Sequence, residues 1–280
     1  MSANPPRTRG FRAEQLGEGE TVTVLIPEPD VVPRRSFVGR EDLVAQCMAA
    51  WLPLDGAPLH FRLSGPPGVG KNELVYHLAR DVERKPLYIM QGHEEMTPED
   101  VACTARITHD HRVEYVGSPL LASMLTGGIC FFDEIGKVPS RSLSLLASVL
   151  DDRRTLTSVL AGFSVQAAPE FRFCAALNDG DAAAGGLPGY IDERLRPAFQ
   201  LDYPPLEEVF TIVKNGVSGA SGLLLERFRH WAARRDRLSP RQALTLIGYV
   251  VRMLERADGT LTEKSADAAI ALAAEKVYDC

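Results

Sequence analysis

The stretch from Leu59 to Val75, LHFRLSGPPGVGKNELV, constrains the fold more than any other, because a short apolar run leads through a glycine-rich turn into helical spacing. The turn has the form GxxxxGK, which is typical of a phosphate-binding loop between a strand and a helix. Its glycines permit backbone angles that side chains forbid, so several N–H groups can converge on phosphate oxygens. The loop residues expected to bind phosphate are Gly65, Pro66, Pro67, Gly68, Val69, Gly70, Lys71 and Asn72.

Lys71 and Asn72 define what the loop can hold. Lys71 supplies a mobile positive charge to the β- and γ-phosphates, and the helix that follows presents the positive end of its dipole to the same anion. Asn72 stands where Ser or Thr normally holds Mg²⁺, and an amide oxygen ligates Mg²⁺ less habitually than a hydroxyl. The loop therefore predicts nucleotide binding more directly than hydrolysis.

The composition suits a nucleotide-binding domain followed by a smaller one. The chain has 280 residues, 45% of them hydrophobic, and no apolar run approaches the roughly 20 residues of a membrane span. The start lacks an apolar segment behind its positive charges, and the five cysteines show no CxxC spacing, so we expect a reduced, cytoplasmic protein without a secretory signal. The net charge of −6 argues against a general nucleic-acid-binding role.

The order of patterns along the chain predicts three parts. Residues 1–35 are rich in Pro, Arg and Glu and lack sustained periodicity, which indicates an N-terminal arm or linker. Residues 36–203 alternate strand-like and helix-like segments, as expected for an α/β nucleotide-binding domain with a mainly parallel five-stranded sheet. Residues 204–280 show helical spacing alone, which predicts a small α-helical lid domain.

Two of the expected strands end in polar residues that suit phosphate chemistry. GICFFDE runs into Asp133 and Glu134, and EFRFCAALN ends at Asn178. Ligands of open α/β sheets bind outside the carboxyl ends of the strands, so these side chains should face the phosphate-binding loop. Asp133 would hold Mg²⁺, Glu134 would act as general base and Asn178 would orient the attacking water. Read alone, Asn178 before Asp-Gly would be an ordinary turn residue, but the neighbouring motifs favour the functional interpretation.

Three arginines are candidates for contact with the γ-phosphate. Arg194 and Arg196, in IDERLRPAF, are two residues apart and cannot share one helix face. One of them would reach the active site of a neighbouring subunit as an arginine finger, and the other would pair with a nearby carboxylate; we favour Arg194 as the finger. Arg241, the last residue of SPR, begins a helix, where a cation is unfavourable unless an anion faces it, so it would reach the nucleotide from the lid.

Taken in order, these motifs resemble the AAA+ ATPases, which are P-loop nucleotide triphosphatases, and specifically the MoxR-type branch that includes the CbbQ/NirQ rubisco-activase group and the GvpN gas-vesicle group. The sequence motifs that carry the resemblance lie between about Ser36 and Val250 and include FVGRE, GPPGVGK, GGICFFDEI, LDDRRTLTSVLAG, DYPP and SPR. The resemblance implies ATP and Mg²⁺ as cofactors. It assigns Walker A to Lys71, Walker B to Asp133 and Glu134, sensor 1 to Asn178, the arginine finger to Arg194 and sensor 2 to Arg241.

The resemblance also implies an assembly and a client. Members form rings, here expected to be hexameric, and relatives commonly work with a partner that carries a von Willebrand factor A domain. The polar stretch Arg106 to Val116 matches the family's helix-2 insert, which lines the central pore and touches the protein substrate. His109, Asp110 and His111 in this stretch invite a metal site, but a solvated turn is the favoured interpretation.

Three functions compete on these motifs. The first is an ATP hydrolase of MoxR type, a chaperone or activase that remodels a partner protein. The second is a nucleotide-gated assembly or binding protein, in which Asn72 weakens Mg²⁺-dependent hydrolysis and ATP holds an oligomer together. The third, a DNA-remodelling motor, is disfavoured by the acidic balance and by the lack of an appended DNA-binding domain.

Overall fold

The computed structural model describes residues 8–14, 21–53, 56–180, 186–235, 237–255 and 262–278. The chain divides into two compact units that interleave along the sequence. The first comprises Met1–Val32, Glu41–Ser64 and Leu74–Gln200, and the second comprises Pro33–Arg40, Gly65–Glu73 and Leu201–Cys280. The phosphate-binding loop is thus grouped with the C-terminal helices, whereas the sequence predicts that it lies in the α/β domain of residues 36–203.

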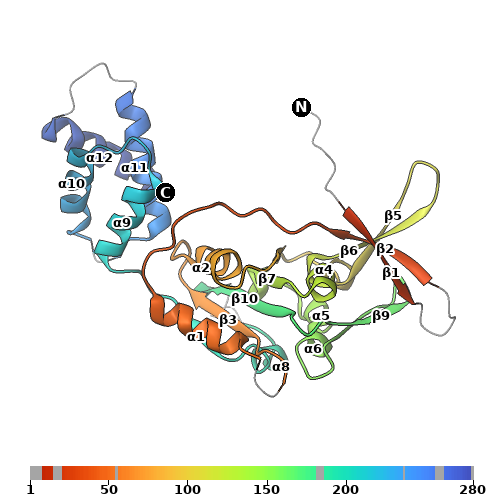
Figure 1. Ribbon diagram of the computed structural model, residues 1–280. Helices are drawn as coiled ribbons and strands as arrows, with labels where there is room; N and C mark the ends of the chain where they lie inside the picture. The colour runs from red at the N-terminus through yellow and green to blue at the C-terminus, as the bar shows by residue number, and fades with distance from the viewer. Residues whose placement is uncertain are drawn as a thin grey trace. The chain divides into compact units, whose positions relative to one another are not determined.

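A five-stranded sheet forms the centre of the first unit (Figure 1). Parallel pairings join β11 to β3, β10 to β7 and β7 to β4, and β3 lies beside β10. The strands β7 and β10 are nearly continuous apolar runs, as expected for strands that are covered on both faces. The predicted α/β fold with a parallel five-stranded sheet is therefore confirmed. In spatial order the strands are β11 (Ala198–Gln200), β3 (Phe61–Gly65), β10 (Arg172–Asn178), β7 (Ile129–Asp133) and β4 (Leu87–Gln91).

Short helices surround this sheet. The best defined is α4, in which the hydroxyl of Ser118 accepts a bond from the N–H of Leu121, Pro119 occupies the first turn, and Gly127 ends the helix at φ 69°. The helical pattern in residues 140–152 is realised as two separate short helices. The helices are α1 (Glu41–Trp51), α2 (Lys71–His77) with its π-helical continuation (Leu78–Val82), α3 (Pro98–Val101), α4 (Pro119–Thr126), η2 (Ile135–Lys137), α5 (Ser140–Leu143), α6 (Leu146–Val149) and α8 (Gly189–Asp192).

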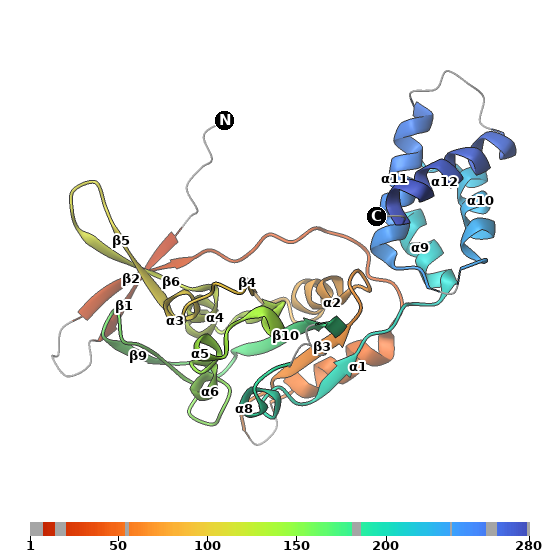
Figure 2. The same ribbon diagram turned by 180° about the vertical axis from the view of Figure 1, so that it is seen from behind.

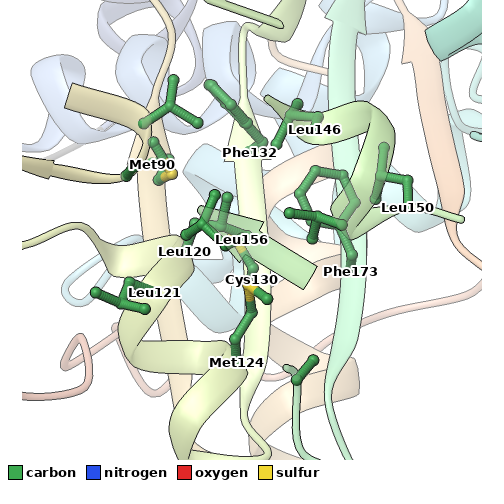
Figure 3. Close-up of a cluster of buried hydrophobic side chains, with 14 of the residues drawn as sticks. Met90, Leu120, Leu121, Met124, Cys130, Phe132, Leu146, Leu150, Leu156 and Phe173 are labelled. Carbon is green, nitrogen blue, oxygen red and sulfur yellow. The ribbon is translucent and has the colours of Figure 1, made fainter. Parts of the chain in front are cut away.

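The main apolar core lies between the sheet and these helices (Figure 3). Cys130 and Phe132 point to the same side of β7 because side chains alternate along a strand. They meet Leu120 and Met124 of α4 together with Phe173 of β10, and all five side chains are buried. This packing fixes the positions of β7 and β10, whose last residues carry the polar groups predicted for the site.

A second sheet has the order β1-β2-β6-β5, from β1 (Thr8–Glu14), β2 (Thr21–Pro27), β6 (Val113–Gly117) and β5 (Cys103–Ile107). The sequence predicts an arm or linker over residues 1–35, whereas the structure forms two strands there. The signal lies in TVTVLIP, where Val22, Val24 and Ile26 alternate with more exposed residues and are buried. The stretch Arg106 to Val116 forms part of the β5–β6 hairpin, which projects from this sheet in both views (Figure 2).

A hairpin precedes β10 and consists of β8 (Thr155–Ser158) and β9 (Phe163–Gln166), which pair antiparallel. The second unit contains the predicted C-terminal helices, α9 (Leu206–Gly216), α10 (Gly222–Ala232), α11 (Pro240–Glu255) and α12 (Glu263–Tyr278). They share a separate apolar core that includes Val213, Phe228 and Leu246. Among the described residues, no helix is long and apolar enough to cross a membrane.

Candidate functional site

The phosphate-binding loop joins β3 to α2, and its backbone explains two of its glycines. Gly65 has φ 148° and Gly70 has φ 103°, both in the region that favours glycine. A Cβ on Gly65 would lie 2.2 Å from the carbonyl oxygen of Leu201, whereas a Cβ on Gly70 would meet nothing within 4 Å. Gly65 is therefore required by close backbone packing, and Gly70 by its backbone angle beside open space.

Lys71 begins α2 and is only 6% exposed. Its Nζ donates to the carbonyl oxygens of Gly65 at 2.6 Å and Pro66 at 3.1 Å. These two bonds hold the ammonium group over the backbone of the loop. A lysine in this position can neutralise the charge of a phosphate that the loop binds.

The start of α11 lies against the same loop. The hydroxyl of Ser239 caps the helix by accepting a bond from the N–H of Gln242 at 3.1 Å. The N–H of Arg241 donates to the carbonyl oxygen of Gly68 at 3.5 Å, and a Cβ on Gly68 would lie 3.1 Å from the Cβ of Arg241. The structure thus brings the exposed Arg241 next to the loop, within one compact unit.

Glu134 stands at the carboxyl edge of the five-stranded sheet, directly after β7. Its backbone is left-handed, with φ 52° and ψ 37°, a conformation that is uncommon for a residue with a side chain and that often marks functional sites. One carboxylate oxygen accepts a bond from Nδ2 of Asn178 at 3.4 Å. The structure therefore brings together Glu134 and Asn178, which are 44 residues apart and end neighbouring strands.

Two further side chains hold Glu134, and sequence reasoning did not single them out for this role. Gln91 Nε2 and Lys137 Nζ both donate to the second carboxylate oxygen of Glu134, at 2.8 Å and 2.9 Å. Gln91 is the last residue of β4, so the signal was available: it is a polar residue that ends a predicted parallel strand, like Asn178. Lys137 lies three residues after Glu134, in the short helix η2.

Asp133 is the last residue of β7 and is partly buried. Its Oδ1 accepts a bond from the backbone N–H of Glu134 at 3.0 Å. A carboxylate is an oxygen donor of the kind that Mg²⁺ prefers, so Asp133 fits the chemistry of a magnesium ligand. Within the described residues, no group of three or more His, Cys, Asp and Glu side chains could hold a metal ion. His109, Asp110 and His111 therefore do not form such a group.

The two arginines after α8 differ in their partners. Arg196 Nη2 bonds to Oδ2 of Asp192 at 2.5 Å, the carboxylate pairing expected for one of the two. Arg194 instead donates to the carbonyl oxygen of Tyr190 at 2.7 Å and lies 3.9 Å from the carboxylate of Asp151. Nε of Arg194 is buried with no hydrogen-bond partner in the described part of the chain. Of the two, Arg194 is therefore less firmly tied to a carboxylate.

Comparison with protein families gives one match along this region. The family described as "AAA domain (dynein-related subfamily)" matches residues 60–199, which are 140 of the 280 residues. The matched range contains β3, the phosphate-binding loop, Asp133, Glu134, Asn178 and Arg194.

Two curated relatives are similar in sequence. The denitrification regulatory protein NirQ of Pseudomonas aeruginosa is 28% identical over 197 residues, which cover 70% of this chain and 68% of that protein. Protein NorQ of Paracoccus denitrificans is 30% identical over 162 residues, which cover 54% of this chain and 56% of that protein. The chain thus matches little more than half the length of NorQ.

Among solved structures, the Holliday junction branch migration motor RuvB of Thermotoga maritima has a similar fold. The TM-score is 0.56 at 20% identity, and the match covers 84% of this chain and 70% of that chain. At this identity the likeness concerns the fold alone.

Proposed function

Because the chain belongs to the AAA domain family, in its dynein-related subfamily, we propose that it is an ATPase that binds ATP with Mg²⁺ and remodels or activates a partner protein. The observation that carries this proposal is the cluster around Glu134. Its carboxylate is held at the sheet's carboxyl edge by Gln91, Asn178 and Lys137. An acidic group fixed by donors at that edge is what a general base for an attacking water requires.

ATP binding is assigned to the loop from Gly65 to Asn72. Its glycines adopt positive φ angles, the backbone geometry that lets N–H groups converge on phosphate, and Lys71 supplies the positive charge. Arg241 adds a second cation beside Gly68 and would report on bound nucleotide from the helical unit. Asn72 and Asp133 would hold Mg²⁺, which supplies neutralisation of phosphate charge when bound. Their joint role is taken from the motif pattern, since they belong to different compact units.

Hydrolysis is assigned to the strand ends. Glu134 would accept a proton from water as the water attacks the γ-phosphate, and Asn178 would orient that water. In this proposal Gln91 and Lys137 are positioning residues, because they bond to the base rather than to the substrate.

A ring completes the site. We assign the arginine finger to Arg194, whose guanidinium would meet the γ-phosphate on a neighbouring subunit of a hexamer. The hairpin from Arg106 to Val116 would touch a protein client in the cytoplasm, with a von Willebrand factor A protein as the expected partner. Similarity to NirQ and NorQ supports a MoxR-type chaperone or activase. Nucleic acid is not an expected partner, since the net charge is −6.

Asn72 supports a second candidate, a nucleotide-gated assembly protein with weak hydrolysis. An amide in place of a hydroxyl lowers the expected contribution of this position to Mg²⁺ binding. ATP would then stabilise the oligomer instead of driving a cycle.

ATP titration and steady-state ATPase assays on the full chain separate these candidates. Lys71→Ala should weaken ATP binding by about 100-fold or more while the protein stays folded, because the lysine contacts loop carbonyls and phosphate instead of the core. If wild type turns over and Asn72→Thr changes the rate only slightly, the remodelling ATPase is supported. If wild type binds ATP without turnover and Asn72→Thr restores it, the assembly protein is supported. A folded Lys71→Ala variant with unchanged ATP affinity would contradict both.

A further inference from the structure

Residues 39 and 40 form an unusual turn inside the second unit. Gly39 and Arg40 have φ values of 71° and 61°, so two consecutive residues are left-handed although the second carries a long side chain. This turn directs the Arg40 guanidinium to two backbone carbonyls. Its Nη2 donates to Val69 at 3.2 Å and to Asp202 at 2.7 Å. One side chain thus joins the phosphate-binding loop to the segment that leads into α9.

The charges around this turn are complementary. Burial lowers the pKa of the Arg40 guanidinium, and the carboxylates of Glu208 and Asp202 offset part of that effect. Glu208, in the first turn of α9, lies directly on the turn, because a Cβ on Gly39 would be 2.4 Å from its carboxylate carbon. Oε2 of Glu208 is buried and has no hydrogen-bond partner among the described residues. The carboxylate therefore acts on Arg40 through its charge.

The loop meets this segment elsewhere as well. Gly65 packs against the carbonyl oxygen of Leu201, one residue before Asp202. The carbonyl group of Val69 belongs to the centre of the loop, between Gly68 and Gly70, where the N–H groups must converge on phosphate. A donor that holds this carbonyl fixes the orientation of the adjacent peptide group.

We propose that Arg40 is a positioning residue that holds the phosphate-binding loop in its phosphate-competent shape by tying Val69 to Asp202, with Glu208 as its counter-charge. This inference rests on the proposed ATP binding. Arg40 touches no reacting group, so its effect passes through the loop. The consequence is that loop shape depends on the position of the segment from Asp202 to Glu208.

Arg40→Met tests this in the full chain, because methionine keeps an apolar stem and removes the donors. ATP affinity, measured by titration calorimetry, should fall about tenfold or more, since the lost bonds come from a charged donor. KM for ATP should rise while kcat at saturating ATP stays within about twofold of wild type. Arg40→Lys keeps a charged donor and should recover most of the affinity. Loss of packing alone would predict the same affinity for both variants.

Arg35→Met is the matched control. Arg35 lies in the same segment of the second unit and pairs with Glu73 at 3.1 Å, on a more exposed surface. Its removal should change ATP affinity by no more than about twofold.

The inference is overturned if folded Arg40→Met binds ATP like wild type, or if Arg35→Met loses as much affinity as Arg40→Met. If Arg40→Met does not fold, Glu208→Gln replaces it, with an expected loss of about threefold and no loss as the contradicting result. A wild-type protein that binds no ATP would overturn the proposed function together with this inference. If wild type binds ATP and Arg40→Met binds it equally well, only this inference is overturned and the proposed function stands.

Discussion

At the carboxyl edge of the five-stranded sheet, polar side chains at the ends of three strands bond to one another, whereas at the amino edge two basic side chains are buried. Gln91, Glu134 and Asn178 are linked at the first edge, and the Glu134 side chain is 29% exposed. His60 precedes β3 and Arg172 begins β10 at the opposite edge, and each is 6% exposed. Both edges belong to the same compact unit.

Protonation of His60 at the amino edge is unfavourable in the folded chain. The His60 ring lies 5.9 Å from that of Phe173, and burial, followed by the nearby Arg154 and Arg172, lowers the pKa of His60 to about 3. Nδ1 of His60 and Nε of Arg172 are buried without hydrogen-bond partners in the described part of the chain. Such groups affect the free energy of unfolding, because burying a polar atom without a hydrogen bond is unfavourable.

We propose that the difference between the two edges separates the strand-end residues that serve chemistry from those that serve stability. Groups at the carboxyl edge are partly exposed and bonded through side chains, so they can meet water and substrate in a fixed geometry. Groups at the amino edge are enclosed. Substitutions at the carboxyl edge should therefore change turnover and leave stability nearly unchanged, and substitutions at the amino edge should do the reverse.

Among the residues that donate a hydrogen bond to Glu134, Asn178 should have the largest effect when it is replaced by alanine. We expect ATP hydrolysis to slow by about 100-fold, because the side chain that would orient the attacking water is lost, while the melting temperature changes little. Steady-state ATPase rates and thermal melts check both parts. A large drop in melting temperature with unchanged turnover would place Asn178 among structural residues instead.

Lowering the pH should reduce the free energy of unfolding through His60 at the amino edge of the sheet. Below pH 6.5 the unfolded chain protonates His60, whereas the folded chain keeps it neutral down to about pH 3, so the unfolded state binds more protons and stability falls as pH falls. Relative to neutral pH, the loss attributable to His60 at pH 5 should be about 2 kcal/mol. Chemical denaturation of wild type and His60→Phe measures it as the difference between two pH profiles. Parallel profiles between pH 7.5 and pH 5 would refute the assignment.

Gln91→Ala should produce the smallest of these effects. Removing one of the donors to Glu134 should slow hydrolysis about tenfold without changing ATP affinity, since Lys137 and Asn178 still hold the carboxylate. Glu95→Gln, at an exposed position shortly after β4, is the control and should match wild type. Equal rates for Gln91→Ala and Glu95→Gln would remove Gln91 from the positioning cluster.

Much of the fold was predictable because its signals are local. The phosphate-binding loop requires glycines, and β7 and β10 are continuous apolar runs ending in polar residues, so each could be read within about ten positions of sequence. The alternating helices and strands that follow from residue 36 were predictable for the same reason. β1 and β2 were missed because the composition of the N-terminal region outweighed a short alternation in TVTVLIP.

The side-chain network was harder to predict, because its members come from distant strands. Asp133, Glu134 and Asn178 were identifiable as strand ends, but the bond from Gln91 to Glu134 depends on β4 lying beside β7, an order that periodicity does not give. Arg40 lies in a recognised motif, yet its contacts depend on a left-handed turn and on Asp202, 162 residues away. These contacts depend on the tertiary structure, which brings together residues that are far apart in the sequence.

The variant Glu134→Gln tests whether Glu134 is the general base of an ATP hydrolase. The substitution keeps the shape of the side chain and removes its charge, while Asp133 remains. ATP affinity and ATPase rate should be measured on the full-length wild type and variant under the same conditions. We expect ATP binding at least as tight as wild type, with hydrolysis about 1,000-fold slower. A variant that turns over ATP at the wild-type rate would exclude Glu134 as the base.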